Sequence, residues 1–347
     1  MPAITGVTNP DQGSQAFGGI ISEDVMNKIF DVSKYPLVLT PKLGVDTAKN
    51  EYKEWVVDEL QASVITNKQV DGADTIANDD TQLGDRQGNH CQISTKTVKV
   101  STRANEAGTI GYARELANQI SRRQIELRRD CESAMLSNNA SIKATNASTP
   151  VAGQSGGLGS WIVTNVDSGT GYSAGGFNTS TGVVDAMTVT TTARAMSETM
   201  VRSVSRSVFE EGGESRCFMS TPAMVEGFSS YLFSSSARVA ALQSDVNQQK
   251  SAVTATGSVN VFVSDFSTLT LEPNRLMLEY ATDSTNAYLL DFDYLRVAYL
   301  HGYRTEPLAK QGLSDIRQMA VDWTLCVTNE KAQGMIQGLD PTAAVIA

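Results

Sequence analysis

The sequence predicts a mixed α+β protein, and three observations support that fold class. Within 51–102 and 288–328, apolar side chains recur at every second position, which is typical of β-strands. Between these regions, at 111–138 and 196–208, they recur at three- and four-residue spacing, which is typical of amphipathic helices. Of the 347 residues, 41% are hydrophobic and 19% are charged, so the chain has enough apolar material for a core and enough length for about two domains.

Composition argues against several classes of protein. Lys and Arg number 28 against 38 Asp and Glu, and the net charge of −10 disfavours a protein that grips a phosphate backbone over its whole surface. No run approaches the roughly 20 apolar residues of a membrane helix, and Met1–Gln15 lacks the basic and apolar regions of a secretory signal. We therefore expect no membrane partner.

Cysteine and histidine usage argues against metal and redox chemistry. The only imidazoles are His90 and His301, which disfavours most zinc enzymes and most histidine-dependent hydrolases. No constellation supplies a nucleophile, a base and an orienting group together, so we predict no enzyme, no cofactor and no metal. The cysteines are too far apart for a C-x-x-C motif and indicate free thiols in a reducing cytoplasm: Cys91, Cys131, Cys217 and Cys326.

The N-terminal part predicts an extended arm followed by a projecting hairpin. Residues 1–20 are rich in Gly, Pro, Asn, Gln and Ser, and a helix is expected between Ser22 and Pro36. Strand patterns begin at Glu51 and again over Cys91–Thr102, with a long polar connection between them. Such a connection indicates a role outside the domain that carries it. We expect a neighbouring subunit to order its tip, with Arg86 as a candidate bridge and a solvated arginine as the alternative.

The longest helix is predicted over 111–138. Its apolar stripe is narrow, so the helix is half exposed or contacts a partner chain: Leu116, Ile120, Leu127, Cys131 and Met135. Its other faces carry the only dense basic cluster of the chain, which comprises Arg122, Arg123, Arg128 and Arg129. Three interpretations stay open for this cluster: a solvated helix face, contacts to an acidic neighbouring subunit, or nucleic acid. Interleaved acidic residues weaken the last of these.

Residues 139–185 predict a flexible loop, because Ser, Thr, Gly, Asn and Ala dominate them. Within the loop, Gly153–Gly157 matches the G-x-S-x-G nucleophile elbow around Ser155. That motif has catalytic meaning only on a sharp strand-to-helix turn, and no helix pattern follows it here. A hydrolase that uses Ser155 with His301 is therefore a remote alternative.

The C-terminal half alternates between helix and strand signals. Apolar spacing and the pair Thr221-Pro222 predict helices, and short strands are expected at 216–220, 259–263 and 276–280. The clearest strand of the whole chain is predicted over nine residues, with Trp323 at its centre and a buried face made of Met319, Val321, Trp323, Leu325 and Val327.

Three segments resemble major capsid proteins of tailed bacteriophages, a group with short-tailed members. In chain order they are DRQGNHCQIS, ARELANQISRRQIELRRDCESAMLSN and DWTLCVTNEKAQGMIQGL. The resemblance implies the Hong Kong 97-like (Johnson) fold. Mapped onto this chain, it implies an N-terminal arm at 1–45, an extended-loop hairpin at 46–105, a peripheral domain with a spine helix and the flexible loop at 106–185, an axial domain at 186–290, and return strands of the peripheral domain with the C-terminus at 291–347.

The resemblance also implies a function. We expect a structural protein that self-assembles into hexamers and pentamers of an icosahedral shell around double-stranded DNA, without sequence-specific binding of that DNA. Expected partners are copies of the same chain, a scaffolding protein, a portal and a decoration protein. The place of action is the virion capsid, after synthesis in the cytoplasm of a bacterial host. An encapsulin-like nanocompartment shell, which encloses an enzyme, is the alternative.

Overall fold

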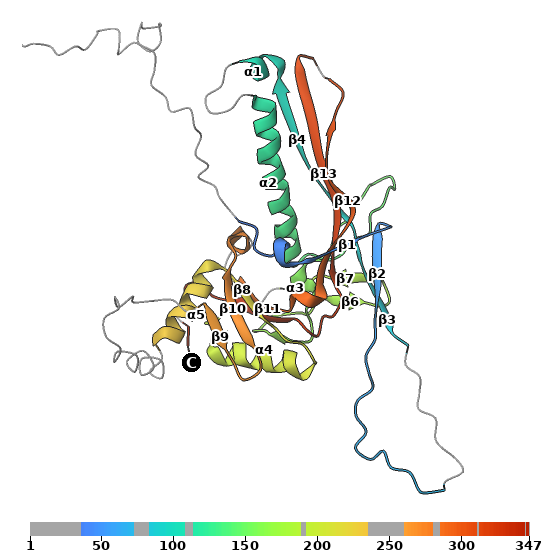
Figure 1. Cartoon of the computed structure of the whole chain (residues 1–347), viewed down its shortest axis with the longest axis vertical. Coiled ribbons are helices and arrows are strands. Elements are labelled where there is room, and N and C mark those ends of the chain that lie inside the picture. Colours follow the sequence, from blue (N-terminus) through green and yellow to red (C-terminus); the bar gives the residue numbers. More distant parts are fainter. Residues whose placement is uncertain are drawn as a thin grey trace, which may run out of the picture.

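A computed structural model describes residues 36–72, 83–107, 114–188, 192–234, 260–279, 285–310, 312–343 and 345–346. The predicted helix before Pro36 and most of the predicted arm lie outside this part of the chain. Figure 1 shows an elongated molecule in which a long sheet and one long helix rise from a second, more compact layer, and a hairpin projects from the side of the sheet. Among the described residues, no helix combines the length and the apolar character needed to span a bilayer.

The long sheet has four strands in the order β1-β12-β13-β4, which span Gly44–Thr47, Leu295–Pro307, Ser314–Val327 and Gln92–Ser101. β1 runs parallel to β12, and the other two pairings are antiparallel. β13 pairs with β4 without interruption from Ser314 opposite Ser101 to Trp323 opposite Gln92. This unbroken register aligns the alternating apolar side chains of β13 with those of β4.

Helix α2, Glu115–Leu136, covers one face of this sheet beside β4 (Figure 1). A helix is thus present in the stretch predicted at 111–138, and 111–113 lie outside the described residues. Short helix α1, Thr102–Glu106, begins where β4 ends, because the Ser101 hydroxyl accepts the Ala104 amide hydrogen at 3.1 Å.

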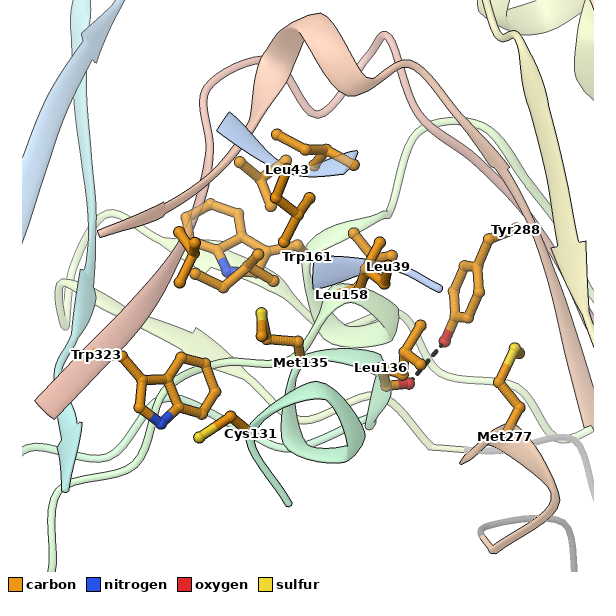
Figure 2. Close-up of a cluster of buried hydrophobic side chains, with 14 of the residues drawn as sticks. Leu39, Leu43, Cys131, Met135, Leu136, Leu158, Trp161, Met277, Tyr288 and Trp323 are labelled. Carbon is orange, nitrogen blue, oxygen red and sulfur yellow. Dashed lines mark hydrogen bonds between the residues drawn. The ribbon is translucent and has the colours of Figure 1, made fainter. Parts of the chain in front are cut away.

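The first core lies between α2 and the long sheet. Cys131 and Met135 of α2 gather there with Trp161 and Trp323 (Figure 2). The buried face predicted around Trp323 is confirmed, because that indole is only 1% exposed and its Nε1 donates to Ser94 Oγ at 3.1 Å.

A second sheet of six strands has the order β5-β14-β11-β8-β10-β9, which span Val166–Asp167, Gly334–Leu339, Thr285–Leu290, Cys217–Ser220, Thr268–Pro273 and Val261–Val263. Helices α4, Glu198–Glu210, and α5, Pro222–Ser234, pack on it around a core that includes Phe218, Phe228 and Phe262. The other face of this sheet belongs to the first core, where the Tyr288 hydroxyl donates to the carbonyl of Leu136 at the end of α2 (3.2 Å; Figure 2).

The projecting hairpin pairs β2, Tyr52–Val57, with β3, Asp85–His90. This corrects the prediction that Cys91–Thr102 is the second strand of the hairpin, since those residues form β4 of the long sheet. β3 escaped detection because Asp85, Gly88 and Asn89 have low strand propensity. Its pairing is fixed by contacts that the sequence does not display, and Gly88 is required because a Cβ there would lie 2.6 Å from the Tyr52 ring.

The prediction of a flexible loop at 139–185 is wrong for much of this segment. This segment contains α3, Leu158–Trp161, and the small hairpin of β6, Gly176–Asn178, with β7, Val183–Asp185. Its glycines are sites of close packing instead of flexibility, since a Cβ at Gly157 would lie 2.1 Å from the Ser137 carbonyl oxygen. That close approach lets Leu158, Trp161, Ile162 and Val184 enter the first core.

The strand predicted at 276–280 is also wrong, because the described part of that stretch lies in the 3-10 helix η5, Arg275–Glu279. The physical reason is the residue that precedes η5, Asn274. Asn274 Oδ1 accepts the Leu276 amide hydrogen at 2.9 Å and begins a turn, which overrides the alternation of apolar residues. Two further 3-10 helices are η3, Thr40–Lys42, and η6, Phe292–Tyr294.

Candidate functional site

Ser155 is a structural residue in this fold. Its side chain is buried, and its Oγ accepts hydrogen bonds from the Leu325 amide (3.2 Å) and from Asn89 Nδ2 (3.1 Å), with Thr324 Oγ1 at 3.3 Å. None of these partners is a base. His301 lies on β12 opposite Asp322. The described residues therefore give the remote hydrolase alternative no nucleophile–base pair.

Asn89 anchors the projecting hairpin to the body of the molecule. Its side chain is fully buried, and Nδ2 donates to the Leu325 carbonyl at 2.8 Å while Oδ1 accepts the Gly156 amide hydrogen at 2.9 Å. One amide thus joins β3, β13 and the segment that contains Ser155. Sequence reasoning missed this residue because it stands in a polar run that resembles a loop.

A second joint at the root of the hairpin involves Tyr52 and His90. The Tyr52 hydroxyl donates to the Gly182 carbonyl at 2.7 Å, and its ring lies 4.6 Å from the His90 ring, centroid to centroid. Burial lowers the pKa of His90; the charge of Glu51 opposes this shift and that of Lys143 adds to it. The hairpin is therefore rooted on neutral, closely packed aromatic groups.

Beyond this root the chain leaves the body of the molecule (Figure 1). Residues 58–72 form no helix or strand and are exposed along their whole length. They nevertheless carry apolar side chains: Leu60 is 94% exposed, Ile65 is 99% exposed, and Val64 and Val70 are also in solvent. Leu83, two residues before β3, is 90% exposed. Apolar surface gathered on a projecting segment is typical of an interaction site.

The five arginines predicted as intersubunit contacts do not converge on one site. Arg86 lies on the exposed part of β3, with its guanidinium 3.7 Å from Glu54 of the same hairpin. The other four lie on α2, where Arg123 pairs with Glu126, Arg128 stands 5.2 Å from the centre of the Tyr303 ring, Arg122 is exposed and Arg129 is half-buried.

The four cysteines are buried and free. Burial raises the pKa of Cys131 to about 11 and that of Cys91, Cys217 and Cys326 to about 12. Thiols with such pKa values are poor nucleophiles near neutral pH. Within the described residues, no three His, Cys, Asp or Glu side chains are grouped so that they could hold a metal ion.

A family model described as the SU10 major capsid protein matches residues 4–340, which is almost the entire chain. The chain belongs to this family of major capsid proteins. The protein is therefore a capsid shell protein, in agreement with the resemblance read from its sequence segments. No curated protein sequence matches the chain.

Solved structures agree with the fold that the capsid family implies. The chain is similar to the capsid protein of a native GTA particle, with a TM-score of 0.58, 13% identity, and 96% and 99% of the two chains covered. It is similar to a chain of Gordonia phage Cozz, with a TM-score of 0.55, 11% identity, and 100% and 97% covered. A chain of the SrpI encapsulin of Synechococcus elongatus gives a TM-score of 0.50, 12% identity, and 92% and 95% covered. The Hong Kong 97-like capsid fold is thereby confirmed.

Proposed function

We propose that this capsid protein assembles into hexamers and pentamers of an icosahedral shell that encloses double-stranded DNA in a phage virion. The observation that carries the proposal is the projecting hairpin, whose apolar side chains find no cover in the described part of the chain. A segment that holds its apolar residues outside its own domain needs a second chain to bury them.

Free-energy magnitudes favour contact between copies over an isolated hairpin. Ordering one residue costs roughly 1–2 kcal/mol of backbone entropy, while burying one Leu, Ile or Val side chain contributes about 1.5–3 kcal/mol. In the single chain, Leu60 and Ile65 contribute almost nothing because they remain in water. If a neighbouring subunit covers them, their burial can offset the entropy cost of ordering this segment and hold the two subunits together.

The proposal assigns a role to each part of the chain. We assign 1–45 to the arm, 106–185 and 291–347 to the peripheral domain, and 186–290 to the axial domain. Since β4 belongs to the long sheet, we limit the extended loop to the hairpin and its tip and place 92–105 in the peripheral domain. A scaffolding protein, a portal and a decoration protein complete the proposed assembly, and the acidic chain suits a container that holds DNA without gripping it.

The content of the particles separates the proposal from a nanocompartment shell, which the fold of the Synechococcus encapsulin keeps as the alternative. Particles produced in an infected host should protect genome-length double-stranded DNA from nuclease. Particles that instead enclose one folded protein and no DNA would favour the alternative. Recombinant particles without a portal are the matched control, because they should form shells that lack packaged DNA.

A further inference from the structure

A cleft of about 1060 Å³ lies between the end of the hairpin strands where Val57 pairs with Asp85, the end of α4 and the turn that follows β13. We call it the acidic cleft, because six carboxylate side chains line it: Asp58, Glu59, Asp85, Glu210, Glu211 and Glu330. Among the described residues of the lining, Lys331 is the only cation. The exposed side chains of Leu60 and Leu83 stand at the same cleft, so it is both acidic and apolar.

Internal ion pairs leave part of this negative charge uncompensated. Lys331 Nζ lies 2.8 Å from Glu59 and 3.3 Å from Glu211, and one ammonium cannot neutralise both carboxylates. Glu330 is occupied, since it accepts the amide hydrogens of Val163 and Thr164 at 2.6 Å.

At the hairpin side of the cleft, Asp58 and Asp85 are exposed. The described residues place no cation in ion-pair contact with either of them. Carboxylates beside exposed leucines are complementary to a cationic surface that has an apolar residue at its centre.

One surface of the same protein has that composition. On α2, Arg122, Ile125 and Arg128 follow each other at three-residue spacing, and all three are exposed. Ile125 is 56% exposed, and within the described part of the chain Arg122 has no ion-pair partner. We call these three residues the arginine face.

The acidic residues that surround the arginine face do not cancel its charge. Glu126 is paired with Arg123, and Asp130 lies 2.7 Å from Lys96 of β4. Glu132 is fully buried. Arg128 stands against the neutral ring of Tyr303 and so keeps its positive charge.

We propose that the acidic cleft of one copy receives the arginine face of a neighbouring copy. The inference rests on the proposed function and names the surfaces that the self-association uses. In Figure 1, α2 and the hairpin lie on opposite sides of the long strands β12 and β13, so the two surfaces are separated within one chain. Two different, complementary patches make a head-to-tail contact, which is the kind that closes into rings.

Electrostatics gives this contact its orientation. Two copies that each carry a net charge of −10 repel each other in most arrangements. The repulsion is least where an uncancelled arginine face meets an acidic cleft, and Ile125 then lies against Leu60 and Leu83. Exposed ion pairs add little affinity on their own but fix register and disfavour wrong orientations.

Charge reversal with rescue tests the proposal. Arg122→Glu and Asp58→Arg, each alone, should raise the protein concentration required for assembly about tenfold, and a chain with both changes should assemble within about threefold of the unmodified protein. Arg103→Glu, the same change at an exposed residue of α1, is the matched control and should have no effect. Melting temperatures of all variants should equal that of the unmodified protein, because all three positions are exposed.

Two results would overturn the proposal. One is normal assembly of both single variants, and the other is a double variant that assembles no better than the worse single variant. If Arg122→Glu leaves assembly intact but reduces the DNA retained in particles, the arginine face contacts nucleic acid and the proposal is wrong. Failure of the unmodified protein to assemble would instead refute the proposed shell function.

Discussion

A single carboxylate of α2 holds three segments of the chain together. Glu132 is fully buried, and Oε1 accepts hydrogen bonds from the amides of Val38 (2.9 Å) and Leu39 (3.0 Å) and from Asn274 Nδ2 (3.2 Å). Oε2 accepts from the amide (2.9 Å) and the hydroxyl (2.7 Å) of Thr40. A buried charge is tolerated here because donors surround it on every side.

Replacing this carboxylate should destabilise the protein strongly. In Glu132→Gln, the amide NH₂ would face groups that are themselves donors, and we expect a loss of about 2–4 kcal/mol in the free energy of unfolding. Glu126→Gln on the same helix, which breaks only a partly exposed ion pair, is the control and should cost less than about 1 kcal/mol. Denaturant titration measures both values. Equal losses for the two variants would show that the buried cluster of hydrogen bonds is not important for stability.

Trp323 is the largest contribution of β13 to the first core. Trp323→Ala removes a side chain that is 1% exposed together with its hydrogen bond to Ser94, and should cost about 3–5 kcal/mol. Ile125→Ala, at an exposed position of α2, should be nearly neutral. A soluble Trp323→Ala protein with an unchanged melting temperature would contradict the placement of this strand in the core.

His90 should make stability depend on pH. Because burial lowers its pKa in the folded state, the unfolded chain binds a proton more readily, at a pKa near 6.5. The stabilisation is therefore complete above that pH and declines as pH falls through it. Unfolding free energies measured at about pH 7.5 and about pH 5.5 should differ less for His90→Gln than for the unmodified protein. The same difference in both proteins would show that the imidazole does not titrate on unfolding.

Among the helices and strands, apolar periodicity predicted those that bury one regular face of side chains. The helix at α2 and the strand at β13 were predictable because each buries one regular stripe of side chains. β3 and η5 were not predictable, because the first is held by Asn89 and Tyr52 and the second by the Asn274 side chain. Hydrogen bonds made by single polar side chains leave no periodic pattern in the sequence.

Only part of the candidate site could be predicted from the sequence. The projecting hairpin and the basic helix followed from the long polar connection and from the density of arginines. The acidic cleft could not be predicted from the sequence. Its carboxylates come from segments that are far apart in the sequence and meet only in the fold: Asp58, Asp85, Glu211 and Glu330. The apolar character of residues 58–72 was visible in the sequence, but their complete exposure was not.

The hairpin should be susceptible to protease until the protein assembles. Lys68 lies in the exposed segment without regular structure, whereas Arg86 is paired into β3, so within the described part of the hairpin trypsin should cut the free protein after Lys68 before it cuts after Arg86. Assembly should protect this bond. Lys68→Gln should remove the early cut and so identify it in a mass spectrum. Cutting at the same rate in free and assembled protein would mean that the hairpin makes no contact between subunits.

The described part of the molecule combines two apolar cores with a projecting hairpin. The first core lies between the long sheet with α2 and one face of the six-stranded sheet, and the second core lies on the other face of the six-stranded sheet. Hydrogen bonds of Tyr288 and Glu132 also join the two layers. The hairpin is rooted by Asn89 but extends beyond both cores (Figure 1). A well-packed body with exposed apolar side chains on a projecting hairpin is the architecture expected of a repeated shell subunit.

Electron microscopy of the purified, concentrated protein tests the shell function most directly. With a scaffolding protein supplied and over a range of salt concentrations, we expect closed shells whose reconstruction contains five-fold and six-fold rings of this chain, with the hairpin of each copy lying on its neighbour. A protein that remains monomeric under all these conditions, by microscopy and by sedimentation, would contradict the proposed shell function.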